Sequence, residues 1–225
     1  MDEMLPALED KDGTIVVTGP VLRSWAHGAN PVFHATSVIV PLLPDGCILF
    51  ADKTEKQLAK GRVIPEGVRV FDIFGGHMGY SDVTEDDREF GLSQKAYREC
   101  AARELSEELL IEKAQGEFCP FPVVAADLIP IGFFRMENDH NKEFSWAYLY
   151  QLPEEGSYAS VDTLIQNGEE RILSQPLINL KPEEAIQMYL KKENGTILFG
   201  DAFGRIVEPD NGEALLRTIR EVSRR

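Results

Sequence analysis

The sequence predicts an α+β fold with a mixed central β-sheet, and two observations carry this prediction. First, β-rich apolar segments lie on both sides of the longest helical segment: 13–18, 33–43, 47–51, 68–74, 121–134 and 144–152. Second, strands and helices do not alternate strictly, as they would in a parallel α/β fold. The chain of 225 residues, 43% of them hydrophobic, is long enough to form a domain with its own core.

Turn residues bound the predicted strands. Segment 33–43 ends at Pro44-Asp45-Gly46, so we expect 47–51 to return beside it as the second strand of a hairpin. The strand at 68–74 is expected to stop at Gly75-Gly76.

Apolar residues that recur with the helical period predict helices at 93–111, 182–192 and 213–222. We find no internal repeat, low-complexity segment or linker, and therefore expect a single domain over residues 1–225. Its expected parts are an N-terminal strand and loop at 1–30, a core at 31–152 and a C-terminal helical extension at 153–225.

Composition excludes several kinds of function. Lys and Arg number 23 against 38 Asp and Glu, and the formal net charge of −15 makes long nucleic acid an unexpected partner. No apolar run approaches the roughly 18 to 20 residues that span a membrane, and the acidic N-terminus is unlike a signal peptide. Three cysteines, Cys47, Cys100 and Cys119, do not suggest a disulfide framework. We expect a cytoplasmic protein with no membrane partner.

Segment 99–111 carries the strongest chemical signal. Residues three and four apart share a helix face, which places Glu104, Glu107 and Glu108 in one acidic patch. Carboxylates on a rigid face suit Mg²⁺ or Mn²⁺, and Arg103 can pair with one of them. The alternative interpretation is a solvated acidic surface.

Residues 103–111, Arg-Glu-Leu-Ser-Glu-Glu-Leu-Leu-Ile, resemble the core of the Nudix box, G-x5-E-x7-R-E-U-x-E-E-x-G-U, in which U is an apolar residue. The resemblance implies an α/β/α sandwich with the box at 75–111. It implies that Glu104, Glu107 and Glu108 bind the metals that polarise a diphosphate, with Glu107 also a catalytic candidate. Arg103 would then be a structural partner of these glutamates.

The box departs from the family pattern at two positions. Lys95 stands where the first glutamate is usual, and an acidic segment at 79–91 separates Gly76 from the helix and splits the box. The missing carboxylate is either supplied by this segment or absent. Leu110 replaces the usual glycine, which costs about 1 kcal/mol or forces another exit from the helix.

Segments around the box resemble the branch that includes isopentenyl-diphosphate isomerase: 19–27, 33–40 and 72–77. By this resemblance His27, His34 and His77 bind a divalent metal together with Glu143, and Asn141 stands in place of a second carboxylate. Each histidine has a structural alternative, as a loop or core side chain. Glu143 has two alternatives, as a catalytic general base outside the box or as an exposed strand residue.

The isomerases also use a cysteine two residues before the histidine of the Gly-His pair, where this chain has Gly75. Allylic isomerisation needs an acid and a base on opposite faces of the substrate. The resemblance therefore argues against isomerase chemistry, although it leaves a metal at the histidines allowed.

Together these features predict a Mg²⁺- or Mn²⁺-dependent hydrolase of a small nucleoside diphosphate or other X-diphosphate. The expected substrate contacts are Lys53, Gly75, Gly76 and Arg103. Lys53 begins a basic segment that either binds phosphate or is a solvated loop. An isomerase-like enzyme and a non-catalytic binding module are the alternative functions. The oligomeric state is open, with a homodimer the commonest assembly.

Overall fold

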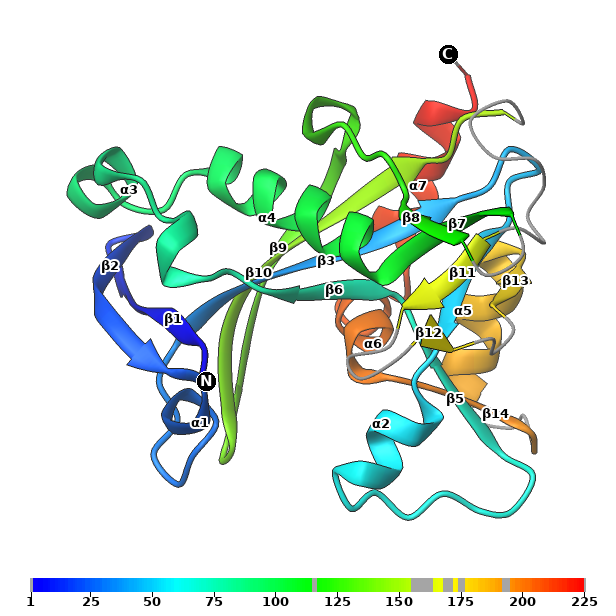
Figure 1. Cartoon of the computed structure of the whole chain (residues 1–225), viewed down its shortest axis with the longest axis horizontal. Coiled ribbons are helices and arrows are strands. Elements are labelled where there is room, and N and C mark those ends of the chain that lie inside the picture. Colours follow the sequence, from blue (N-terminus) through cyan, green and yellow to red (C-terminus); the bar gives the residue numbers. More distant parts are fainter. Residues whose placement is uncertain are drawn as a thin grey trace.

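The computed structural model describes residues 2–114, 117–154, 164–167, 172–173, 177–191 and 195–224. Over these ranges the chain forms a large mixed sheet, a smaller antiparallel sheet and helices on both faces of the large sheet (Figure 1). None of the helices in these ranges combines the length and the apolar character that crossing a membrane requires.

The strands are β1 (Met4–Lys11), β2 (Thr14–Leu22), β3 (His34–Leu42), β4 (Ile48–Asp52), β5 (Arg69–Asp72), β6 (Phe74–His77), β7 (Leu109–Ala114), β8 (Glu117–Pro120), β9 (Ile129–Asn138), β10 (Asn141–Gln151), β11 (Leu164–Asn167), β12 (Ile172–Leu173), β13 (Ile178–Leu180) and β14 (Ile197–Phe199). The helices are α1 (Arg23–Ala26), α2 (Thr54–Ala59), α3 (Glu85–Phe90), α4 (Gln94–Glu108), α5 (Pro182–Lys191), α6 (Asp201–Val207) and α7 (Glu213–Val222), with 3₁₀ turns η1 (Tyr80–Asp82) and η2 (Ala125–Asp127).

The large sheet has the order β14-β5-β4-β3-β1-β2, while β6 and β10 also pair with β3, β9 with β10, and β13 with β4. Strand β10 runs parallel to β3 and β14 parallel to β5, whereas β4, β6 and β9 pair antiparallel with their neighbours. The smaller sheet has the order β12-β11-β7-β8. The predicted mixed central sheet is therefore confirmed.

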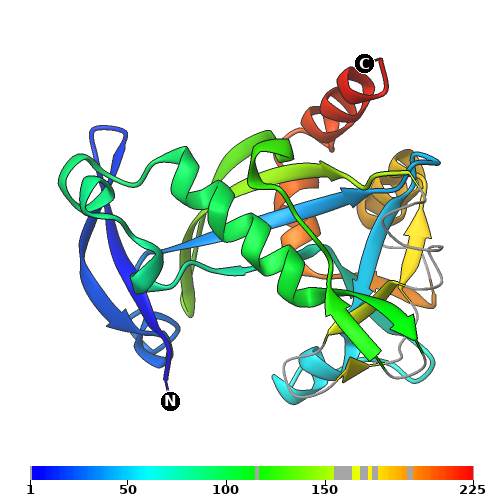
Figure 2. The ribbon, with the colours of Figure 1, turned by 45° about the horizontal axis from the view of Figure 1, so that its top comes forward.

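Strand β3 lies at the centre of the sandwich, and all of its residues are buried. Its side chains alternate between two cores, as the period of a strand requires. Ala35 and Ile39 pack in the core that α4 covers, and Val38 and Val40 pack in the core that α6 and α7 cover. Figure 2 shows α4 lying across one face, with α6 behind the sheet. The predicted α+β fold with the layers of an α/β/α sandwich is confirmed.

The predicted hairpin and the two C-terminal helices lie close to where the sequence placed them. The turn at Pro44-Asp45-Gly46 joins β3 and β4, which pair at Leu42 and Ile48 as the predicted hairpin. Helix α7 has the predicted bounds, and α5 ends at Lys191, with Lys192 outside the described residues.

Other predicted boundaries were wrong. Strand β1 was not predicted, and it pairs with β2 around a turn in which Asp12 and Gly13 have positive φ. The predicted strand at 121–134 begins only at Ile129, after η2. Pro122 lies in the excluded part, and a proline has no backbone N–H to donate to a sheet.

The prediction that Gly75-Gly76 ends a strand was wrong, because the pair lies inside β6. Gly75 has φ of 144°, and a Cβ at this position would lie 2.2 Å from the carbonyl oxygen of Ser37. Only glycine permits both this backbone conformation and this close approach of β6 to β3. The pair marks close packing of two strands rather than a turn.

Helix α4 ends at Glu108, earlier than the predicted 111. Leu109 is already extended, with φ −111° and ψ 121°, and the chain continues directly into β7. The usual glycine is unnecessary because the chain leaves the helix without a left-handed residue. This is the alternative exit that Leu110 was expected to force.

The sequence suggested a helical extension at 153–225, but this part of the chain also contributes strands. Strand β11 pairs with β7, β13 with β4, and β14 with β5. The short strands at 164–167, 178–180 and 197–199 depend on partners far away in the sequence, so no local pattern announced them.

Placing a cysteine at position 75 is expected to strain the sheet. The variant Gly75→Cys should lower the free energy of unfolding by about 2 kcal/mol or more, because the new Cβ meets the backbone of β3. Denaturant unfolding of wild type and variant measures the difference. Gly67→Cys is the matched control, since Gly67 has φ of 76° and open space around it. Equal losses in the two variants would contradict the packing argument.

Candidate functional site

Two side-chain clusters lie on opposite sides of strand β6, and two consecutive residues of the strand, Gly76 and His77, each face one of them. Gly76 pairs with Ser37, whose hydroxyl donates to the carbonyl of Tyr97 in α4, so this position faces the acidic helix. His77 pairs with Thr36, and its ring lies with two other histidines on the other side. Because side chains alternate along a strand, the two clusters adjoin through β6.

Helix α4 can present carboxylates because its other side is anchored in the core. The Ser93 hydroxyl caps the helix by accepting from the backbone N–H of Ala96. Ala101 and Leu105 are fully buried against the sheet. The acidic residues that follow are therefore held on a fixed helical face.

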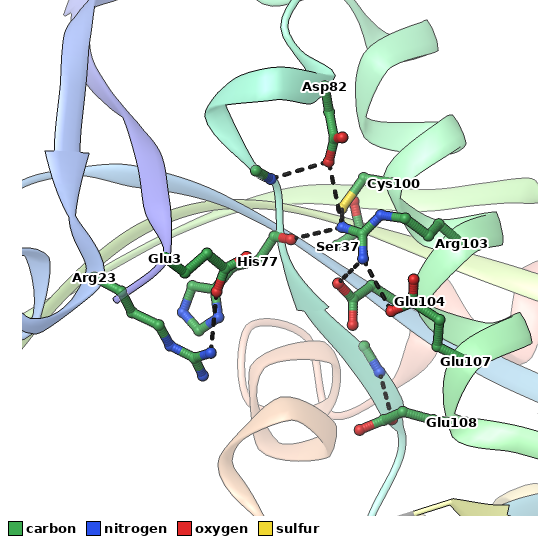
Figure 3. Close-up of polar contacts among 12 residues, drawn as sticks. Glu3, Arg23, Ser37, His77, Asp82, Cys100, Arg103, Glu104, Glu107 and Glu108 are labelled. Atoms are coloured by element: carbon green, nitrogen blue, oxygen red, sulfur yellow. Dashed lines mark hydrogen bonds and ion pairs between the residues drawn. The ribbon is translucent and has the colours of Figure 1, made fainter. Parts of the chain in front are cut away.

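Arg103 holds the acidic cluster together (Figure 3). Its Nη2 donates to the backbone carbonyl of His77 at 2.9 Å and lies 3.3 Å from a carboxylate oxygen of Asp82. Its Nη1 lies 2.8 Å from Glu104 and 3.1 Å from Glu107. One guanidinium therefore reaches three carboxylates, which offsets the repulsion between neighbouring acids on the helix.

Glu108 is held separately from the other two box glutamates. Lys53 Nζ donates to its Oε1 at 2.8 Å, and the backbone N–H of Gly75 donates to its Oε2 at 3.3 Å. Both side chains of this ion pair are largely buried. Lys53 and Gly75, two predicted substrate contacts, thus lie at the acidic cluster.

Glu104 fills the space that Gly76 leaves. A Cβ on Gly76 would lie 2.1 Å from Oε2 of Glu104, so any larger residue at this position would displace the carboxylate. Burial raises the pKa of Glu104 to about 7, with Arg103 opposing the shift and Glu108 and Glu107 adding to it.

The acidic cluster offers the ligand chemistry of a hard divalent cation, but among the described residues no three of its carboxylates bring oxygens within 4.8 Å of one another. Three carboxylates on adjacent turns supply the oxygen ligands that Mg²⁺ and Mn²⁺ prefer. The raised pKa of Glu104 marks a carboxylate whose charge is poorly compensated, and a cation would compensate it.

The second cluster has the spacing of a metal centre. Within the part of the chain that the structure describes, one group qualifies, His27, His34 and His77, with ligand atoms all within 4.8 Å of one another. The Nε2 atoms of His27 and His77 are 2.9 Å apart. His34 Nδ1 lies 2.9 Å from the carbonyl oxygen of Val32, which places the proton on Nδ1. His34 Nε2 is buried and has no hydrogen-bond partner.

The three imidazoles are suited to bind a metal. Burial lowers the pKa of all three, that of His27 to about 4, and the positive charge of Arg23 adds to the effect. Near neutral pH the rings are therefore uncharged, which is the form that ligates a metal. An orphaned, buried Nε2 beside two further ring nitrogens fits a nitrogen-bound divalent ion.

Glu143 lies beside the histidines and not with the α4 carboxylates. It pairs with His34 across β10 and β3, and its Oε1 is 4.0 Å from His34 Nε2. Burial opposes its ionisation, but the guanidinium of Arg205 and the amide of Asn141 lower its pKa overall. Only 4% of the residue is exposed, so it is not the exposed strand residue that one interpretation suggested.

The acidic segment 79–91 serves the site through one residue. Asp82 accepts from Arg103 and from the backbone N–H of Gly79. Asp87 is instead the N-terminal capping partner of Thr84 in α3 and also accepts from the backbone N–H of Ser93. Asp82 is thus the carboxylate of this segment that lies at the acidic cluster.

Sequence reasoning missed the residues that surround Glu143. Thr36 Oγ1 donates to Glu143 at 3.0 Å, and Ser145 Oγ lies at 3.5 Å. Arg205 in α6 forms an ion pair with the same carboxylate. The period of two along β3 and β10 could have placed Thr36 and Ser145 beside it. No signal in the sequence linked Arg205 to this position.

Comparisons with known proteins bear on the fold. No family model matches the chain, and no curated protein sequence matches it. The crystal structure of DR0079 from Deinococcus radiodurans aligns with a TM-score of 0.52 and 17% identity, over 96% of this chain and 99% of that one. The solution structure of DR0079, a hypothetical Nudix protein, aligns with a TM-score of 0.41 and 16% identity, over 98% and 96%.

The chain shares its fold with DR0079. A MutT Nudix hydrolase from Burkholderia pseudomallei also aligns, with a TM-score of 0.37 and 12% identity, over 68% of this chain and 85% of that one. At these identities the likeness concerns the fold, and the assignment of activity depends on the residues of the site.

The buried carboxyl of Glu104 should make stability depend on pH. Its folded-state pKa of about 7 exceeds the ordinary value of 4.5, so the folded state binds more protons between these values. The free energy of unfolding therefore falls as pH rises through this window. In Glu104→Gln this contribution is absent, and denaturant unfolding in a chelating buffer should show a smaller fall. Glu99→Gln, a more exposed change on the same helix, is the control and should keep the wild-type dependence of unfolding free energy on pH. If Glu104→Gln kept that dependence too, the raised pKa would not belong to Glu104.

Proposed function

We propose that this protein is a hydrolase that cleaves a diphosphate linkage in a small molecule with the help of Mg²⁺ or Mn²⁺. The observation that carries the proposal is the cluster of three α4 carboxylates that Arg103 and Lys53 hold against the glycines of β6. The fold shared with DR0079, a hypothetical Nudix protein, supports it as a likeness in architecture. Substrates of this kind are anionic, and a cation would overcome the repulsion from a chain of net charge −15.

Glu104, Glu107 and Glu108 would hold the catalytic cation. Once bound, it would neutralise the diphosphate oxygens and lower the pKa of a water molecule. The three histidines would hold a second divalent cation on the neighbouring side of β6.

The chain's own groups have distinct tasks in this mechanism. Arg103 positions Glu104 and Glu107, and Lys53 has a cationic head that can contact a phosphate when the substrate competes with Glu108. Glu107 is more exposed than Glu104, with 58% of its side chain accessible against 14%. It can therefore reach a water molecule beside the substrate and act as general base. Glu143 is less suited to that task because Arg205 and Asn141 stabilise its ionised form.

A second candidate is an isomerase-like enzyme that acts on an isoprenoid diphosphate. The three-histidine cluster favours it, because the resemblance to the isomerase branch includes these positions. Such an enzyme would lack the usual acid, because position 75 is a glycine. The thiol of Cys100, near Arg103, is a poor substitute: burial, and secondly the charge of Glu104, raise its pKa to about 12. Product analysis separates the two functions, since isomerisation releases no phosphate.

Replacing one carboxylate should slow turnover strongly. With Mg²⁺ or Mn²⁺ and a panel of nucleoside, sugar and isoprenoid diphosphates, Glu107→Gln should lower the hydrolysis rate by about a hundredfold or more, because a ligand or base is lost. Released phosphate is quantified after phosphatase coupling. Glu99→Gln, on the same helix and paired with Lys95, is the matched control and should keep wild-type activity.

Near-normal turnover of Glu107→Gln would remove this carboxylate from the mechanism. Absence of hydrolysis with every substrate, in folded protein that binds metal, would favour the isomerase-like enzyme or a non-catalytic binding module.

A further inference from the structure

Arg205 is a buried cation beside the histidine cluster that the proposed mechanism does not use. Its Nη1 forms an ion pair with Oε2 of Glu143 and lies 3.4 Å from Ser145 Oγ. The side chain is only 17% exposed, and its Nε is buried without a hydrogen-bond partner. Burying a charge in this way is costly unless it is paired, so the pair with Glu143 is a strong structural constraint.

Both oxygens of Glu143 are already engaged. Oε2 accepts from Arg205 and Thr36, with Ser145 nearby. Oε1 accepts from the side-chain amide of Asn141 at 2.5 Å. Arg205, Thr36 and Asn141 together occupy three of the roughly four lone-pair sites of this carboxylate, which leaves little acceptor capacity for a metal ion.

The position of Arg205 is fixed by the cap of α6. Asp72, at the end of β5, accepts from the backbone N–H groups of Ala202 and Phe203 at 3.2 and 2.8 Å. Phe203 and Ile206 are buried in the core below the sheet. Since α6 is anchored at its start and along its apolar side, the backbone of Arg205 is held at a fixed place beside Glu143.

One histidine nitrogen of the cluster, in contrast, has no partner, whereas the Nε2 atoms of His27 and His77 contact each other. His34 Nε2 is fully buried and has no partner, and it is 4.0 Å from the nearest oxygen of Glu143. A divalent ion bound to the three imidazoles would therefore sit near Glu143 and also near the positive charge of Arg205, which would repel it.

We propose that Arg205 is a positioning residue that keeps Glu143 out of the ligand set, so that the metal centre is a three-histidine site with its remaining positions open to water or substrate. Glu143 then acts on the metal only as a nearby negative charge. The inference rests on the proposed metal-binding role of His27, His34 and His77. It assigns to helix α6 a direct influence on the coordination of the metal.

Co²⁺ absorption tests the inference, because the visible bands of Co²⁺ weaken and shift as its coordination number rises. The full chain is titrated with Co²⁺ as wild type, Glu143→Gln, Arg205→Met and the double variant. His27→Gln identifies which bands belong to the histidine site. The double variant removes both charges of the pair, so it controls for the instability of an unpaired Glu143 in Arg205→Met.

We expect Glu143→Gln to keep the wild-type band positions and intensities, because no ligand is lost. Arg205→Met should show weaker, shifted bands and a Co²⁺ dissociation constant about tenfold lower or more, as Glu143 joins the metal and a repelling charge is removed. The double variant should return to the wild-type spectrum.

Altered bands in Glu143→Gln alone would show that Glu143 is already a ligand and would overturn the inference. Wild-type bands in Arg205→Met with Co²⁺ bound would overturn it as well, while leaving the histidine metal site intact. If wild type shows no bands that depend on His27, the metal site itself fails and the inference fails with it. That outcome leaves hydrolysis at the α4 carboxylates to its separate test with Glu107→Gln.

Discussion

The arrangement of the site depends on the contacts of one guanidinium, that of Arg103. It joins α4 to β6 through the carbonyl of His77 and gathers the carboxylates of Asp82, Glu104 and Glu107 around it (Figure 3). Without this cation the acidic residues of the helix would repel one another and turn toward solvent. With it, they stay at the edge of β6, where the proposed diphosphate and metal would bind.

The glycines of β6 make this arrangement sterically feasible. Gly75 lets β6 approach the backbone of β3, and Gly76 leaves room for the carboxylate of Glu104. The next residue, His77, turns its ring toward the histidine cluster. The carboxylates of a helix and the three imidazoles therefore meet along three residues of one short strand.

Local patterns in the sequence were enough to predict parts of this architecture. The Pro-Asp-Gly turn, the amphipathic helix α7 and the acidic face of α4 follow from spacing within a few residues. The same patterns could not distinguish a glycine pair that ends a strand from one that allows two strands to pack closely. The bond between Arg205 and Glu143 joins residues 62 positions apart, and only the packing of α6 brings them together.

The proposed function depends on where divalent metal binds, and anomalous diffraction from crystals soaked in Mn²⁺ locates that site directly. The account predicts an anomalous peak between the carboxylates of α4 and the glycine edge of β6, within coordination distance of Glu107. A Mn²⁺ peak confined to other parts of the protein, with the α4 carboxylates still paired only with Arg103 and Lys53, would contradict it.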